Sequence, residues 1–261
     1  MIPSILTRSP TALQVAKIGQ AMEVARVKHE KSIQYNMNRA FKAMRLKLYA
    51  LDDIPTDRDI ERIATGQDTF IRRVLVNNFV SMGNELESVA TDQLDRTSRE
   101  ELFEAYVYQT VGVHITMIDD TTRKVIRRMM ADADSVLEFQ NNLDRFWMSS
   151  QTHRSYVIAR TETSASSNAT VHLTVTKHDT GRKVLKTWHT FGDTAVRLGH
   201  REMNGVEIPS DELFEVPVYK TIDGIPVRIG TDRMEFPADM NANAHASNVV
   251  NCRCYLTYRY V

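Results

Sequence analysis

Cysteine and histidine are the residues of this sequence best suited to bind a metal ion. Cys252 and Cys254 are its two cysteines, and one residue separates them near the end of the chain. Together with His200 and His245 they would form a Cys₂His₂ set of the kind that holds structural zinc. The cysteine spacing is shorter than usual for such sites, and the two histidines are 45 positions apart. Two interpretations stay open: a zinc site without a free position for catalysis, or buried thiols beside hydrogen-bonded histidines.

A second chemical group consists of Asp193, Arg197 and His200, which could serve as an acid, an oxyanion-stabilising cation and a base. Spacings of four and three residues would place them on one face of a helix. The same pattern is expected for a salt bridge followed by a histidine at a helix end. No nucleophile motif and no phosphate-binding glycine loop accompanies the group. We therefore expect no enzymatic activity, with a metal-dependent hydrolase built on Asp193, the two histidines and the cysteines as an alternative.

Charge is distributed unevenly along the chain. Residues 1–50 carry nine Lys or Arg and two Glu (+7), residues 51–149 carry eleven basic and nineteen acidic residues (−8), and residues 150–261 carry +1, which sums to zero. The basic segment predicts either packing against the acidic body or a face offered to the phosphates of nucleic acid or to an acidic protein. The candidate binding residues are Lys28, Lys31, Arg39, Lys42, Arg45 and Lys47.

Length and composition limit the class of protein. With 261 residues, 42% of them hydrophobic and 25% charged, the chain has an ordinary globular composition and is long enough for one large or two small domains. No run of eighteen apolar residues predicts a membrane-spanning helix, so we expect no membrane partner. The first ten residues do not resemble a secretory signal, and two cysteines are too few for a disulfide framework, which favours an intracellular protein.

The elements that must position these groups begin with helices. Ser9 and Pro10 predict a helix start, and Asp52–Thr56 predicts its end. A capping-box pattern at Ser98 and Glu101 predicts another start, and Asp119–Thr122 predicts a boundary. Between these points, apolar residues recur every three or four positions, in the sets Ile33, Met37, Phe41, Met44, Leu48; Leu75, Phe79, Met82, Leu86, Val89; Phe103, Val107, Val111, His114; and Ile126, Met130, Ala133, Leu137. Residues 1–149 are therefore predicted to form an elongated, all-helical bundle with methionines filling its core.

Residues 150–261 have a different texture. The helical pattern continues to about Asn168 or beyond, with small residues along one face at Thr161 and Ala165. Val184–Phe191 predicts a strand around a buried Trp188, Asp223-Gly224 predicts a hairpin turn, and the alternation over 255–261 predicts a terminal strand. The fold class is thus α+β: an elongated helical domain at 1–149 followed by a small α+β domain at 150–261.

The second domain also resembles a known family. Its ordered motif residues are Arg160, Glu162, Trp188, Asp193, Arg197, His200, Gly205 and the stretch Asn251-Cys252-Arg253-Cys254. This set resembles the C-terminal domain of tailed-phage minor head proteins, the Mu F-like or SPP1 head-morphogenesis family. The chain departs from the family pattern at Ala195, where an arginine is usual, and at residues 243–247, where a proline is common.

The resemblance implies a minor capsid protein of the virion interior, assembled in the host cytoplasm and associated with the portal vertex. It implies a role in head assembly and in DNA packaging or delivery, including ejection with the genome. The implied partners are the portal protein, the major capsid or scaffolding protein, and packaged double-stranded DNA. No cofactor is implied, and the alternative function is a nucleic-acid-binding module without a virion role.

Overall fold

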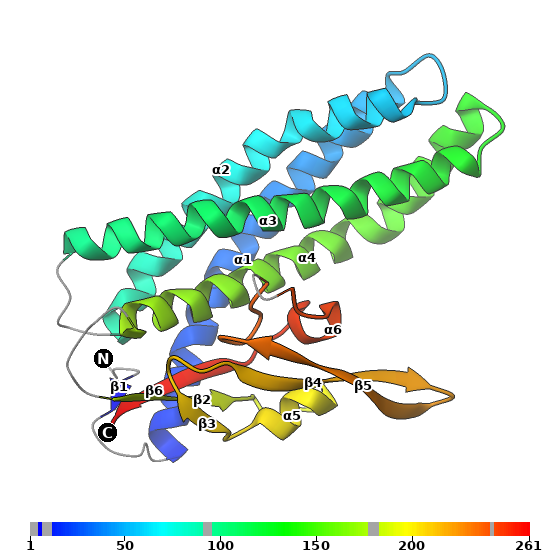
Figure 1. Cartoon of the computed structure of the whole chain (residues 1–261). Coiled ribbons are helices and arrows are strands. Elements are labelled where there is room, and N and C mark those ends of the chain that lie inside the picture. The colour runs from blue at the N-terminus through cyan, green and yellow to red at the C-terminus, as the bar shows by residue number, and fades with distance from the viewer. Residues whose placement is uncertain (1–4, 7–11, 91–95, 177–182, 241–242) are drawn as a thin grey trace.

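The computed structural model describes residues 5–6, 12–90, 96–176, 183–240 and 243–261, and it confirms an α+β fold. Four long helices lie alongside one another, and a small β region packs against one part of the bundle (Figure 1). The helices are α1 (Ala12–Tyr49), α2 (Asp57–Ala90), α3 (Arg96–Ala131) and α4 (Val136–Thr176). No helix in the described ranges is both long and apolar enough to cross a membrane.

The helices form because their apolar stripes meet in one core. The stripe of α1 is fully buried from Ile33 to Leu48, and the stripe of α2 is buried from Leu75 to Leu86. Met37 and Met44 are completely buried among Phe79, Leu143 and other apolar side chains, as predicted for methionines that fill the core, whereas Met117 and Met148 are exposed and depart from that prediction. Burying such stripes supplies most of the stability of long helices, since helix propensity alone contributes little.

Two reciprocal caps set the helix starts. The backbone N–H of Asp59 donates to Thr56 Oγ1 at 3.2 Å, and the N–H of Thr56 donates to Asp59 Oδ2 at 3.0 Å, so α2 begins directly after the predicted break. At α4 the N–H of Glu138 donates to Ser135 Oγ at 3.2 Å, and Glu138 Oε2 accepts from the N–H of Asp134. The predicted cap of α1 at Ser9 lies outside the described residues.

The predicted boundary at Asp119–Thr122 is wrong, because α3 continues through it to Ala131. The hydroxyls of Thr121 and Thr122 donate to the carbonyls four residues earlier, those of Met117 and Ile118, at 2.8 and 2.7 Å. Their side chains therefore bond within the helix instead of ending it. The true turn follows Ala131.

Two related helix predictions also fail. Ser98 and Glu101 lie inside α3, which already includes Arg96, so their capping-box pattern does not start the helix. Leu137 is exposed at the first turn of α4, because the chain reverses at 132–135 and takes Leu137 out of the predicted stripe. A capping-box spacing is short enough to arise inside a helix, where glutamate and serine are both tolerated.

The β region contains two sheets. One has the order β1-β6-β2-β3, in which β1 runs parallel to β6 and the other neighbours are antiparallel; the second is the antiparallel hairpin β4-β5. The strands are β1 (Ile5–Leu6), β2 (Val184–His189), β3 (Glu207–Pro209), β4 (Phe214–Ile222), β5 (Ile225–Met234) and β6 (Tyr255–Tyr260). Two short helices join them, α5 (Leu198–Met203) and α6 (Ala246–Val249).

The predicted hairpin and terminal strand are confirmed. Asp223 and Gly224 have φ values of 50° and 80°, the left-handed conformations that a tight hairpin turn requires. The hairpin projects away from the rest of the molecule in Figure 1. The terminal strand β6 lies between β1 and β2, with Trp188 opposite Leu256, so the first and last strands of the chain are neighbours.

Helix α4 joins the bundle to the β region without a break. It runs through residue 149, and its second half enters a second core with Ala165, Ala169 and Val175. The first part of α1 contributes Ile18 and Met22 to that same core. The division at 149/150 stays a prediction, and α1 and α4 both extend across the space between the two cores.

Candidate functional site

The turn before β6 is the part of the molecule where most of the singled-out residues meet. Cys252 and Cys254 are buried there and face His200 of α5. His200 Nδ1 lies 3.7 Å from Cys252 Sγ and 3.4 Å from Cys254 Sγ. The three ligand atoms all lie within 4.8 Å of one another. Three of the four predicted metal-ligating residues are therefore together.

His245, the fourth predicted ligand, is placed elsewhere. It is the N-cap of α6, where its Nδ1 accepts from the backbone N–H of Ser247 at 3.2 Å and contacts Ser247 Oγ at 2.8 Å. Its own backbone N–H donates to Asp232 Oδ2. His245 is not among the residues whose ligand atoms gather within 4.8 Å of one another, so it does not complete the predicted Cys₂His₂ set.

The two thiols interact strongly with each other. A hydrogen bond from Cys254, together with the nearby His200, holds the pKa of the Cys252 thiol well below its usual range. The hydrogen bond to Cys252, reinforced by burial, raises the pKa of Cys254 in turn. The pair therefore holds its first negative charge easily and resists a second one.

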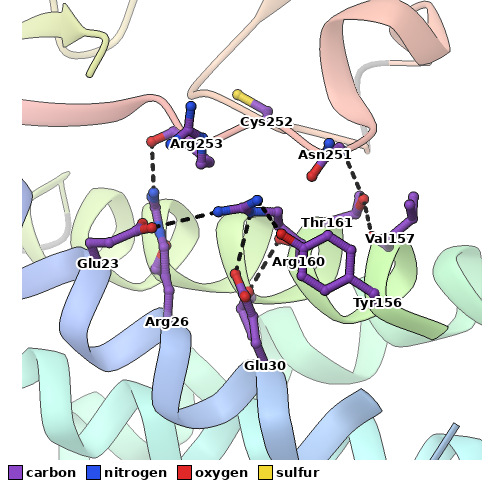
Figure 2. A network of polar contacts seen from close by, with 12 residues as sticks. Glu23, Arg26, Glu30, Tyr156, Val157, Arg160, Thr161, Asn251, Cys252 and Arg253 are labelled. Atoms are coloured by element: carbon purple, nitrogen blue, oxygen red, sulfur yellow. Dashed lines mark hydrogen bonds and ion pairs between the residues drawn. The ribbon is translucent and has the colours of Figure 1, made fainter. Parts of the chain in front are cut away.

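Arg26 of α1 fixes the backbone of this turn. Its side chain is buried, and it donates to the carbonyl oxygens of Arg253 at 2.8 Å and Cys254 at 3.1 Å and to Ser167 Oγ at 2.7 Å. Figure 2 shows the guanidinium rising from α1 toward the turn. Burial lowers the pKa of Arg26, although Glu23 and the cysteines act against that change.

A second arginine extends the network along α4. Arg160 Nη2 lies 3.6 Å from Glu23 Oε1, and Arg160 Nε lies 3.6 Å from Glu30 Oε1, both on α1. Arg160 also donates to the hydroxyl of Tyr156 (Figure 2). Burial raises the pKa of Glu30, and Arg160 opposes that rise. Thr161 Oγ1 accepts the backbone N–H of Asn251 at 2.9 Å, so α4 also holds the turn directly.

Asp193 and Arg197 do not form the predicted helical face with His200, because α5 begins only at Leu198. Asp193 instead pairs with Arg253, which lowers the pKa of its carboxyl. Arg197 donates to the carbonyl of Val250. Both side chains therefore hold the ends of the cysteine turn, and the acid-cation-base arrangement predicted for them is not formed.

Residues 120–257, more than half of the chain, match the family model of phage Mu protein F-like proteins. The chain belongs to the phage Mu protein F-like family. It is accordingly a phage head-related protein, as the ordered motif residues predicted. Comparisons with curated proteins and with solved structures gave no match.

The remaining Mu F-like motif residues have structural roles, which their burial and backbone conformation show. Trp188 is fully buried at an edge-to-face contact with Phe214, with ring centroids 5.2 Å apart, so its predicted core position is confirmed. Gly205 has a φ of 84° and donates its N–H to the carbonyl of Trp188 at 2.8 Å, a left-handed position that suits glycine. Asn251 is left-handed as well, with a φ of 59°.

Glu162 of the Mu F-like motif is buried in a different place from Arg160, because residues two positions apart face different sides of a helix. It pairs with His114 of α3, and both side chains are almost inaccessible. They line a cavity of about 620 Å³ between α3, α4 and the loop before β6, together with mostly apolar residues. This pair thus ties α3 to α4 at the junction of the two cores.

The predicted basic residues of this Mu F-like chain divide into two groups. Lys28 and Arg45 form ion pairs with Glu85 and Asp144, at 2.7 and 2.6 Å, so part of the charge is neutralised within the molecule. Lys31, Arg39, Lys42 and Lys47 are exposed and form no ion pair with the residues that the structure describes.

Sequence reasoning missed Arg26, which lies in the same basic segment. One signal was available: an arginine four positions after Met22 and seven before Ile33 falls on the buried side of α1. A buried arginine requires acceptors, and neither the carbonyls of the turn nor Ser167 can be inferred from α1 alone.

Proposed function

We propose that this protein is a minor head protein of the virion interior, assembled in the host cytoplasm at the portal vertex, with a structural role in DNA packaging or delivery. Membership in a structural phage family supports a non-enzymatic role. The observation that carries the proposal is an exposed cationic and apolar face along α1, which we call the α1 face. It consists of Lys17, Val24, Lys31, Tyr35, Lys42 and Leu46.

Helix geometry gathers these residues on one side. At about 100° per residue, Lys17, Lys31 and Lys42 fall within about 40° of one another around the helix axis. Lys47 points about 140° away from Lys42. The three lysines also extend over about 37 Å of helix length, at about 1.5 Å per residue.

The apolar members favour a protein partner over DNA. Val24, Tyr35 and Leu46 lie beside these lysines and are 60–63% exposed. Phosphate contacts need cations and hydrogen-bond donors, whereas protein interfaces combine aromatic and apolar anchors with a polar rim. An acidic surface on the portal protein, or on the major capsid or scaffolding protein, would complement the α1 face in both charge and hydrophobicity.

Removing the whole basic segment is not a suitable test. Ile18 and Met22 enter the second core, and Ile33 to Leu48 form the first, so deletion of residues 1–50 would unfold the protein. The surface must be changed while the buried side of α1 stays intact.

The test is co-purification with procapsids from cells that produce the portal and capsid proteins of the same phage. The variant Lys17→Gln/Lys31→Gln/Lys42→Gln removes three charges from the α1 face. Its matched control removes three exposed charges elsewhere, Lys47→Gln/Lys124→Gln/Arg128→Gln. We expect the first variant to lose at least about tenfold in occupancy and the control to keep it, since rim charges contribute mainly to association.

Two results would reject the proposal. If both variants co-purified with procapsids to the same extent, the α1 face would not be the attachment surface. Binding of the purified protein to double-stranded DNA, weakened steeply by salt and by the α1-face variant, would instead favour the nucleic-acid-binding alternative, because phosphate contacts release counterions.

A further inference from the structure

Two thiols and an imidazole converge from distant segments at the turn before β6. Cys252 and Cys254 lie on the turn, and His200 comes from α5, about fifty positions earlier in the chain. All three side chains are at most 3% exposed. Their positions are fixed from several sides, by Arg26 on the turn carbonyls and by Arg197 on the carbonyl of Val250.

The spacing of the three ligand atoms fits a metal centre. In tetrahedral coordination, Zn–S bonds of about 2.3 Å and Zn–N bonds of about 2.05 Å separate sulfur from nitrogen by about 3.6 Å. The two observed separations from His200 Nδ1 are 3.7 and 3.4 Å, to Cys252 Sγ and Cys254 Sγ. His200 Nδ1 is thus at nearly the same distance from both sulfurs, which is the arrangement of three ligands around one shared ion.

We propose that His200, Cys252 and Cys254 bind one zinc ion through Nδ1 and the two sulfurs, with a water molecule as the fourth ligand. A cavity of about 20 Å³ borders the cluster and is lined in part by Phe191, Ala195 and Arg197. That volume suffices for one water molecule. His245 takes no part, since its ring caps α6.

Charge and chemistry favour zinc among the available metals. Both sulfurs bind as thiolates, so any thiol proton still present is released to solvent, and the two thiolates balance the double positive charge of the ion. The buried centre is therefore neutral. Thiolate and imidazole ligands are those that zinc prefers, whereas magnesium and calcium take oxygen ligands.

The ion would act as a crosslink. It would join α5 to the turn that leads into β6, and Arg26 would connect the same turn to α1 through the carbonyl of Cys254. Because a ligand that binds only the folded state stabilises it, zinc removal would lower the melting temperature of the whole chain.

The experiment uses the full chain, purified from zinc-supplemented medium without chelators. We expect elemental analysis to find about one zinc per chain, and cobalt(II) substitution to give the sulfur-to-cobalt charge-transfer bands of a two-thiolate, tetrahedral site. Cys252→Ser, Cys254→Ser and His200→Ala should each reduce zinc affinity at least about tenfold. His245→Ala is the matched control and should keep both the metal and the spectrum.

A second measurement needs no variant. In the unaltered protein, zinc should protect both thiols from a thiol reagent, and a chelator should restore their reactivity. Absence of stoichiometric zinc together with no cobalt spectrum would overturn the proposal. Iron or copper in place of zinc would overturn the choice of metal, and loss of metal in His245→Ala would overturn the ligand set.

Discussion

The middle of the helical bundle and the cysteine turn are both buried, but different forces hold them. The bundle core consists of apolar side chains from all four long helices, among them Met37, Met44 and Phe79. The cysteine turn is surrounded by buried polar groups, including Arg26, Ser167 and Thr161, each bonded to a specific partner.

This difference determines which substitutions the two regions tolerate. An apolar core accepts substitutions of similar volume, because dispersion contacts and burial are not directional. A buried polar network is destabilised when one member is lost, since the groups that were bonded to that member are left buried without it. We therefore expect the largest effects on stability at the turn and the smallest in the bundle.

The largest effect is expected for Arg26→Met. The substitution removes three hydrogen bonds, two of them fully buried, and leaves the carbonyls of Arg253 and Cys254 without this donor. We expect the free energy of unfolding to fall by about 3–5 kcal/mol, as for the loss of one partner from a buried charged network. Urea denaturation followed by circular dichroism measures it.

The bundle supplies the matched control, Met37→Leu, which changes an equally buried residue on the same helix. A volume-conserving change of this kind should cost less than about 1.5 kcal/mol. If Arg26→Met lowered the free energy of unfolding no more than Met37→Leu, the proposed difference in stability between the two regions would be contradicted.

A smaller effect is expected for Gly199→Ala, at the contact between α5 and β4. A Cβ atom on Gly199 would stand 2.2 Å from the carbonyl oxygen of Pro217, which belongs to the backbone and cannot rotate away. We expect a loss of about 1–3 kcal/mol, typical of overpacking, measured by thermal and urea unfolding. Unchanged stability would show that α5 can move away from β4 freely, which would weaken the placement of His200.

Among the buried polar groups of the bundle is the carboxyl of Asp119. Burial and the neighbouring Asp68 raise the pKa of Asp119 to about 7, against the opposing effect of Arg123. The folded state therefore binds this proton more tightly than the unfolded state. Its stabilising contribution is complete below the unfolded pKa of about 4 and is lost as the pH rises through about 7.

We expect stability to fall between about pH 4 and 7, by at most about 1.4 kcal/mol per pH unit for one proton, and to level off above that range. Asp119→Asn should flatten this dependence, and Asp120→Asn, which changes its exposed neighbour, should not. Urea midpoints across this pH range provide the measurement. A slope that persists in Asp119→Asn would assign the dependence to another group.

The smallest effect is expected for Gly112→Ala in the interior of α3, and it has the opposite sign. Apart from its chain neighbours and the backbone of α3 itself, no described atom lies within 4 Å of the position that the new Cβ would take. Alanine is favoured over glycine inside a helix by about 1 kcal/mol, so the melting temperature should rise slightly. A lower melting temperature would indicate that neighbouring atoms pack against Gly112 and leave no room for a methyl group.

Much of the bundle follows from local rules. Recurring apolar residues predicted the buried faces of α1 and α2, and Asp52–Thr56 predicted the break between them. The failures were also local: the polar stretch at Asp119–Thr122 was expected to end a helix. The threonine hydroxyls bond back to the preceding turn, and the Asp119 carboxyl forms a hydrogen bond with Asp68 of α2, so these polar side chains give no reason for a break.

The candidate site was predictable only in part. The ordered motif from Arg160 to Cys254 indicated the family, and the residue types indicated that His200 and the cysteines suit a metal. The spacing of residues in the sequence could not show which histidine lies near the cysteines, because His200 and His245 are equally plausible ligands until their loops are placed. The N-cap geometry of α6 decides between them.

The periodicity of apolar residues and the order of the motif were enough to determine an α+β chain of the Mu F-like family, since both are properties of sequence alone. Only the tertiary structure brought β1 beside β6, placed Arg26 on the carbonyls of the cysteine turn and separated His245 from the other candidate ligands. The physical reason is that hydrogen bonds and metal coordination depend on distances of a few ångströms between residues far apart in sequence, and packing alone sets those distances.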